Sequence, residues 1–335
     1  MKISIGLNTN LLNSDEYIDF INTNAYSTYF SLSMLPDARG VTSTDSDIVY
    51  ILERLKLLTC KKYLVCNGIM ASPDVYIPNS VKHLQTKYLM QLVRPLIDGI
   101  VFYDLAFLTM FQSVLSGIDM IPTVNFSLDS ISKIESMLSH MQLILGQLPS
   151  KLSLDRSLNR DHNKLVSISE HMRKKYPEIE LELVVNEGCI LNCPYKNAHD
   201  CNIAVSSWKN EISEFMRIAC HRYHFKNDFK FILTSPFVRP EDLDKILPYI
   251  DVIKIAGRNF DFETQKDVVL AYQQKFYYMN LCNLIEVFRP YKEGLFINSD
   301  LFPPNFYDIT SSCEKNCSTC MYCVKVFEKH AHIFK

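Results

Sequence analysis

The alternation of short apolar segments with helical patterns constrains the fold of this chain more than any other feature. Eight segments read as strands: residues 2–8, 28–33, 61–67, 99–103, 120–125, 152–155, 181–186 and 252–256. Apolar residues at helical spacing follow several of them, for example at 45–57, 130–145 and 163–175. Strands that alternate with helices form parallel βαβ units, so the sequence predicts an α/β fold, a (β/α)8 TIM-type barrel. An open doubly wound sheet is the alternative, although no GxGxxG motif follows the first strand.

The predicted barrel takes up most of the 335 residues, which is enough for one large domain of this kind. It spans residues 1–289 and includes a long insert, 188–250, between the seventh and eighth strands. The insert holds a further candidate strand at 229–233, and a closing helix is expected at 263–288. Residues 290–335 follow as a cysteine-rich C-terminal extension with metal-binding potential.

The composition is that of an ordinary globular protein, with 47% hydrophobic and 21% charged residues. A formal net charge of −2 gives no overall field that would attract nucleic acid or a membrane surface. The first residues lack the apolar length of a signal peptide, and no run of about 18 apolar residues occurs. These features predict a cytoplasmic protein that does not associate with membranes.

Polar side chains follow most of the predicted strands, at the ends that meet at one mouth of a parallel barrel. The candidates are Asn67, Asn125, Asp155, Asn186, Glu187, Lys254 and Arg258. Asn and Asp also begin ordinary turns after strands, which is the alternative interpretation of each residue taken singly. Together the candidates predict a polar substrate pocket. Asn186, Glu187 and Asp155 are the candidate catalytic residues, and the others are candidates for substrate binding. Lys254 and Arg258 are suited to an acidic group, because guanidinium and ammonium groups pair with carboxylate or phosphate.

Three cysteines lie just beyond the seventh strand, in the stretch LELVVNEGCILNCPYKNAHDC (181–201), and a fourth follows in the insert. In a cytosolic chain, closely spaced cysteines indicate metal ligands more than disulfides. We therefore expect Cys189, Cys193, Cys201 and Cys220 to hold one metal or iron–sulfur site, with His224 as an alternative to Cys201. Cys60, Cys66 and Cys282 stand alone in apolar surroundings and are expected to be buried structural thiols.

The densest group of cysteines is the C-terminal run SCEKNCSTCMYC, spaced C-x3-C-x2-C-x2-C. It contains Cys313, Cys317, Cys320 and Cys323. Thiolates this close repel one another unless a cation neutralises them. Structural zinc sites usually draw two ligand pairs across a longer loop, whereas a single run is closer to iron–sulfur spacing. A [4Fe–4S] cluster, a zinc ion and a run without bound metal are all open interpretations here.

The stretches VVNEGCILNCPY (184–195) and FVRPEDLDKILPYIDVIKIAGRN (237–259) resemble peptidase family U-32, the collagenase-like group. Members of that family have a cysteine-bearing strand end and a later Lys-Ile-x-Gly-Arg strand, matched here by residues 254–258. The resemblance implies a barrel with four cysteine ligands to a [4Fe–4S] cluster and, for several members, oxygen-independent hydroxylation. By this resemblance, the family's functional residues correspond here to Cys189, Cys193, Cys220 and Arg258. The fourth family cysteine, expected just before Arg239, falls on residues 234–236, which lack one.

From these observations we expect an iron–sulfur barrel enzyme that modifies a small molecule, a peptide or an RNA base without using oxygen. The implied partners are an acidic small-molecule co-substrate, an electron donor and a second subunit of similar fold. The first alternative is a U-32-type peptidase or hydrolase, although the chain has neither a GxSxG elbow nor an HExxH helix. The second alternative is a non-catalytic subunit in which the cysteine run binds zinc and docks a partner.

Overall fold

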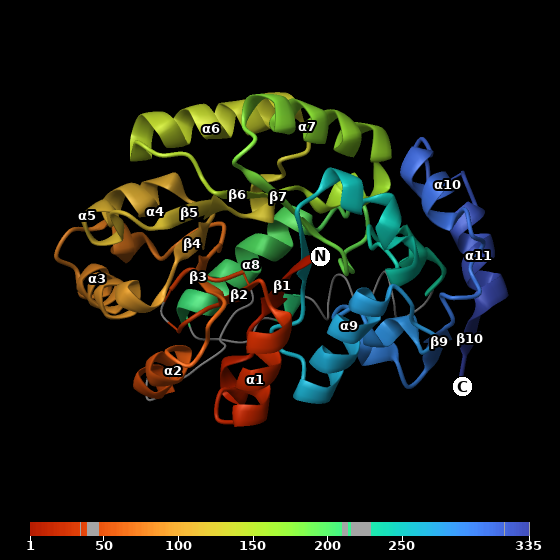
Figure 1. Ribbon diagram of the computed structural model, residues 1–335, viewed down its shortest axis with the longest axis horizontal. Coiled ribbons are helices and arrows are strands. Elements are labelled where there is room, and N and C mark those ends of the chain that lie inside the picture. The colour runs from red at the N-terminus through yellow and green to blue at the C-terminus, as the bar shows by residue number, and fades with distance from the viewer. Residues whose placement is uncertain (34, 39–46, 210–213, 216–228, 318, 335) are drawn as a thin grey trace.

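The computed structural model describes residues 1–33, 35–38, 47–209, 214–215, 229–317 and 319–334. Within them, eight parallel strands form a barrel surrounded by helices, which confirms the predicted fold class (Figure 1). The strands are β1 (Lys2–Gly6), β2 (Ser27–Phe30), β3 (Lys61–Cys66), β4 (Gly99–Phe102), β5 (Asp119–Pro122), β6 (Lys151–Ser153), β7 (Glu180–Val184) and β8 (Val252–Ile255). They are hydrogen-bonded in the order β5-β4-β3-β2-β1-β8-β7-β6.

The barrel is nearly closed, with its seam between β5 and β6. These two strands are neighbours in space, but no ladder joins them among the described residues. Polar contacts of the flanking loops hold the seam instead. The Ser150 backbone N–H donates to the Asp119 carboxylate at 3.0 Å, and the Asp155 N–H donates to the Leu128 carbonyl at 3.2 Å.

Side chains alternate between the outside and the inside of the barrel, as the two-residue period of a strand requires. In β7, Leu181 and Leu183 join the main core between strands and helices, while Glu182 lies between them in sequence and points the other way. In β8, Ile253 and Ile255 join the same core, and Lys254 faces inward. The apolar strand pattern therefore packs the helices, and the intervening residues fill the barrel.

The barrel interior has an apolar half and a charged half. The apolar half is a cluster of Tyr29, Tyr63, Val65, Val101 and Ile121. In the charged half, the Glu182 carboxylate lies 2.6 Å from the Lys151 ammonium and 3.0 Å from the Lys254 ammonium, and it accepts a hydrogen bond from Ser153. Burial opposes the charge on Glu182, but the two ammonium groups outweigh it and lower the pKa of this carboxyl to about 2.

The helices lie around the barrel and across its mouth (Figure 1). They are α1 (Asp15–Asn24), α2 (Ile48–Leu55), α3 (Val81–Val93), α4 (Leu105–Met110), α5 (Gln112–Leu115), α6 (Ile131–Leu145), α7 (His162–Lys175), α8 (Lys196–Lys209) and α9 (Phe262–Gln274). Side chains of Ser or Asp cap several of the amino termini, as at Ser14, Ser80, Ser130 and Asp261. Such caps satisfy backbone N–H groups that have no partner inside the helix.

Two expectations about the second half of the chain are wrong. Residues 229–233 form a 3₁₀ segment, η8 (Phe229–Thr234), and not a strand. Both edges of β8 are already occupied by β1 and β7, so this apolar run has no sheet edge to join there. The closing helix α9 ends at Gln274, because Lys275 takes a left-handed conformation with φ of 55°. Short 3₁₀ segments, Leu281–Asn283 and Arg289–Tyr291, follow it.

The C-terminal segment packs on one side of the barrel rather than standing apart. Its elements are β9 (Leu295–Ile297), α10 (Phe306–Ser312), α11 (Tyr322–His330) and β10 (Ala331–Ile333), and β9 and β10 pair antiparallel. Helix α10 contacts α7, and α11 contacts η8. Figure 1 shows this group at the edge of the barrel. No helix in the described part of the chain is long and apolar enough to span a membrane.

Candidate functional site

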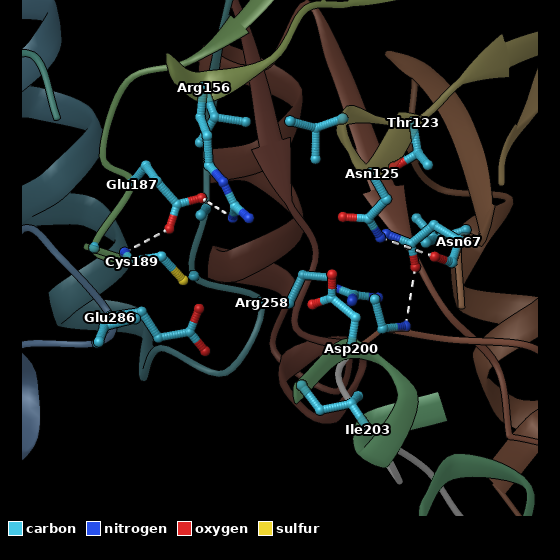
Figure 2. Close-up of a pocket in the computed structure, with 18 of the residues that line it drawn as sticks. Asn67, Thr123, Asn125, Arg156, Glu187, Cys189, Asp200, Ile203, Arg258 and Glu286 are labelled. Atoms are coloured by element: carbon cyan, nitrogen blue, oxygen red, sulfur yellow. Dashed lines mark hydrogen bonds and ion pairs between the residues drawn. The ribbon is translucent and has the colours of Figure 1, made fainter. Parts of the chain in front are cut away.

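A pocket of about 630 Å³ opens at the carboxyl ends of the strands, where polar residues were expected (Figure 2). Six of the predicted side chains line it: Asn67, Asn125, Asn186, Glu187, Lys254 and Arg258. Helix α8 crosses the mouth and adds His199, Asp200 and Ile203 from the other side. The site is therefore a cleft between the barrel and a helix of the insert, which is where barrel enzymes keep their chemistry.

The segment after β7 brings a thiol, a carboxylate and a guanidinium together. The Glu187 carboxylate lies 2.6 Å from the Arg156 guanidinium and accepts a hydrogen bond from the Cys189 backbone N–H at 2.8 Å. Figure 2 shows these three residues on one wall of the pocket. Burial acts to lower the pKa of Arg156, but the charges of Glu187 and Cys189 outweigh it and raise that pKa. Arg156 is thus a fixed cation beside the Cys189 thiol.

Asn186 uses its side chain to join the ends of two strands. Its amide nitrogen donates to the carbonyls of Ala256 at 2.8 Å and Leu284 at 3.0 Å, and its oxygen accepts from the Ala256 N–H at 2.7 Å. The residue is buried. Asn186 therefore lines the pocket, but its side chain hydrogen-bonds to the backbone. These bonds fix the direction in which the chain leaves β7 toward Glu187.

The remaining predicted polar residues divide between the pocket and the structure around it. Asn125 donates to the Asn67 carbonyl at 3.0 Å, and the Asn67 side chain accepts from the Ala38 N–H at 3.0 Å. Both line the pocket (Figure 2). Asp155 is not among the lining residues. It caps the 3₁₀ segment Arg156–Arg160 (η6) by accepting from the Ser157 N–H at 2.8 Å, so it positions Arg156.

The two predicted anion-binding cations already have carboxylate partners. Arg258 lies 2.9 Å from Asp37 and donates to the Ser31 hydroxyl at 2.6 Å, while Lys254 pairs with Glu182. Burial lowers the pKa of Lys254 and neighbouring cations add to this effect, against the attraction of Glu182. Across the mouth, Asp200 and Glu286 supply further negative charge. The pocket therefore presents both signs of charge to a ligand.

Gly257 gives a sharp local test of how the mouth is built. Its φ is 129°, and a Cβ atom added there would lie 2.2 Å from the Phe260 ring. We expect Gly257→Ala to lower the free energy of unfolding by about 2–4 kcal/mol, measured by urea denaturation, through both backbone strain and steric overlap. Gly146→Ala is the control, because Gly146 also has positive φ but meets nothing within 4 Å. It should lose only the strain energy of about 1–2 kcal/mol, and equal losses would contradict the overlap.

The cysteines of the insert are only partly described. Cys189 lines the pocket, Cys193 lies in the loop before α8, and Cys201 lies within α8. All three are partly exposed, and none of them forms a disulfide. Cys220 and the alternative ligand His224 lie outside the described residues. Within the described part of the chain, no group of three or more His, Cys, Asp or Glu side chains is arranged to hold a metal ion.

The expected burial is confirmed for two of the three isolated cysteines, whereas Cys60 is only partly buried. Cys66 and Cys282 are buried, and burial raises the pKa of the Cys282 thiol to about 12 and that of the partly buried Cys60 to about 11. Thiols of this kind are inert. Cys313, Cys317, Cys320 and Cys323 line a separate small cavity at the C-terminal segment.

Sequence patterns missed the contribution of α8 and of the loop after α9. His199, Ile203 and Ser206 recur at helical spacing on α8, but only Ile203 of the three is apolar, so hydrophobic periodicity does not mark that wall. Glu286 and Val287 enter the pocket from a segment without regular structure. No periodic signal marks such a segment.

Comparisons with known proteins agree with this barrel. No family model matches the chain. A curated relative, the uncharacterized protease MJ1657 of Methanocaldococcus jannaschii, is 28% identical over 180 residues, which are 53% of this chain and 52% of that protein. The matched region thus spans about half the length of that relative. The solved structure of the U32 peptidase Mk0906 superimposes with a TM-score of 0.50 at 14% identity, over 77% of this chain and 93% of that one. At that identity the structural match shows the fold.

Proposed function

We propose that the chain is a divergent member of the U32 peptidase family, to which it is similar in sequence and fold, and that it is an iron–sulfur barrel enzyme. In this proposal the enzyme carries out an oxygen-independent hydroxylation, or a related modification, of a small molecule, peptide or RNA base. One observation carries it: among the described cysteines, Cys189 lines the barrel-mouth pocket, beside the guanidinium of Arg156. A cation in that place favours the thiolate form that an iron ligand requires.

The donor set fits a [4Fe–4S] cluster in its chemistry. Cys189 lines the mouth, Cys193 lies in the loop before α8 and Cys201 lies in α8, and Cys220 would complete the four thiolates. The bound cluster would supply one-electron chemistry and an electron-poor iron at the pocket. The residues of the chain do the rest. Glu187 holds Arg156 in place, and Asn186 and Asp155 position the segments from which these two side chains extend.

The charges of the pocket favour a ligand that carries both an acidic group and hydrogen-bond donors. Lys254 and Arg258 would bind the acidic group of a co-substrate, in competition with their present carboxylate partners. Asp200 and Glu286 line the same mouth and would accept from donors of the substrate, with the amides of Asn67 and Asn125 between. An external electron donor and a second subunit of similar fold belong to this proposal as partners.

Metal analysis of the full chain, purified without oxygen, tests the proposal. We expect iron and inorganic sulfide together with an absorption band at about 400 nm. Cys189→Ser should remove the iron bound at the mouth, because one thiolate ligand is lost. Cys60→Ser is the matched control, since Cys60 is a partly buried thiol directly before β3, at the amino ends of the strands and not at the mouth, and it should keep the full iron content. A colourless wild-type protein that contains zinc alone would refute the proposal.

A peptide hydrolase is the second candidate, and one observation favours it. Cys189 and His199 line the same pocket, and a thiol with an imidazole is the pair that cysteine hydrolases use. Protein stripped of metal by a chelator should then cleave peptides, and alkylation of Cys189 should abolish the cleavage. An iron-free protein without any cleavage activity would exclude this candidate.

A further inference from the structure

The four C-terminal cysteines are brought around one cavity by two helices and the loop between them. Cys313 caps the carboxyl end of α10, Cys323 lies in the first turn of α11, and Cys317 and Cys320 lie between. All four line a cavity of about 30 Å³, which is larger than a single water molecule needs. Cys320 is exposed and the other three are partly exposed, so the cavity can be loaded from solvent.

A buried cation lies beside these thiols. Arg160 is only 3% exposed, and its described hydrogen bonds go to the carbonyls of Leu233 and Ser235 and not to a carboxylate. The groups whose charges act on it include Cys323, Cys313 and the carboxylate of Asp242, and Asp242 is already paired with Arg239. A second cation, Lys315, donates to the Cys313 carbonyl at 2.6 Å. A buried guanidinium needs a nearby anion, and a metal centre bound by four thiolates is a net anion.

The four cysteines line this one cavity, although within the described residues no group of three or more His, Cys, Asp or Glu side chains is arranged to hold a metal ion. A [4Fe–4S] core holds its four thiolates farther apart than a zinc ion does, because each sulfur binds a different iron. The close C-x3-C-x2-C-x2-C run agrees with iron–sulfur spacing.

We propose that Cys313, Cys317, Cys320 and Cys323 bind a [4Fe–4S] cluster, which Arg160 and Lys315 stabilise electrostatically. This cluster is separate from the one proposed at Cys189. The end of η8 connects the two places: Thr234, its last residue, lines the C-terminal cavity, and the next residue, Ser235, donates to the Gly188 carbonyl at 2.9 Å. Gly188 directly precedes Cys189.

This connection gives the cluster a role that rests on the proposed function. The cluster would accept one electron from a one-electron donor protein and pass one electron to the centre at the mouth. Only the oxidation state of the cluster changes in this cycle, and no bond of the protein forms or breaks.

Iron and sulfide counts on the full chain, prepared without oxygen, distinguish the two sites. Cys317→Ser/Cys320→Ser should lose about four irons and four sulfides per chain relative to the wild type, while Cys189→Ser keeps that set. The proposal would be overturned if the wild type held one zinc ion per chain and the double variant held none. An iron count in the double variant equal to that of the wild type would overturn it as well. If Cys189→Ser alone left the iron count unchanged, the mouth cluster would fail and this one would stand.

A second variant covers the case in which the double variant does not fold. Lys315→Met should keep the iron and shift the reduction potential of one iron–sulfur species to a lower value, followed by electron paramagnetic resonance during a redox titration. The reason is that removal of a cation disfavours the gain of an electron by an anionic cluster. Lys315→Arg is the matched control and should leave the potential near that of the wild type. An unshifted potential in Lys315→Met would overturn the assignment.

Discussion

Glu182→Gln is expected to lower the free energy of unfolding by about 3–5 kcal/mol. Glu182 is the carboxylate between Lys151 and Lys254 inside the barrel, and these residues are 1%, 2% and 9% exposed. The substitution keeps the shape of the side chain but leaves two buried ammonium groups without an anion. Urea denaturation at neutral pH measures the loss.

A control on the same strand separates burial from the mere loss of an ion pair. Glu180 in β7 pairs with Lys2 at the surface, so Glu180→Gln should change stability far less than Glu182→Gln. A combined variant, Lys151→Met/Glu182→Leu/Lys254→Met, should recover most of the stability, because an apolar replacement of a whole buried ion network is often neutral. Equal losses in Glu180→Gln and Glu182→Gln would contradict this account.

The same carboxylate predicts a pH dependence with a definite sign. The pKa of Glu182 is about 2 in the folded chain and near its ordinary value of 4.5 in the unfolded chain. Its contribution is therefore fully present above pH 4.5 and is lost as the pH falls toward 2. Between these values the stability of the wild type should fall more steeply with acid than that of Glu182→Gln. Parallel curves for the two proteins would show that Glu182 is not held ionised.

The strands and the position of the pocket could be predicted from sequence because both follow from local rules. Alternation within a strand predicts its buried face, the intervening helices predict parallel strands, and a polar residue after a parallel strand lies at the mouth end of the barrel. Asn67, Asn125, Glu187 and Arg258 illustrate this, since all four line one pocket. Each of these predictions needed only the residues of one strand and its end.

The partners of these side chains could not be predicted, because they come from elsewhere in the chain. Arg258 pairs with Asp37, which lies 221 positions earlier, in the loop after β2. A strand pattern says that Arg258 faces the mouth, but not that a carboxylate is already there. Helix α8 was missed for a related reason: among its described side chains only Ala204 is buried, so it lacks the apolar stripe that marks a helix in sequence. Conversely, η8 is as apolar as a strand and was mistaken for one, because no local signal reports the absence of a sheet edge.

Arg160→Met is expected to lower the free energy of unfolding by about 3 kcal/mol or more. The Arg160 side chain donates to the Leu233 carbonyl at 2.9 Å and to the Ser235 carbonyl at 2.6 Å, and its guanidinium lies 5.2 Å from the centre of the Phe237 ring. Methionine fills similar space but leaves both buried carbonyls without their charged donor. Removing the guanidinium also removes the cost of burying its charge. The expected loss of stability is therefore smaller than the sum of the energies of the separate hydrogen bonds.

The region that Arg160→Met destabilises is as informative as the size of the stability loss. Arg160 attaches residues 233–235 to η6, and this segment contacts both the Gly188 carbonyl at the barrel mouth and the cavity of the C-terminal cysteines. In Arg160→Met, the amide hydrogens of η8 and α11 should therefore exchange faster than in the wild type, and those of the barrel strands should be affected less. Arg94→Met is the matched control: Arg94 also donates to one backbone carbonyl, that of Ser116 at 2.9 Å, but at the surface, and its loss should change stability by less than about 1 kcal/mol. Uniform acceleration across the barrel in Arg160→Met would instead mean that the arginine stabilises the whole domain, and the C-terminal segment would then have no separate attachment through it.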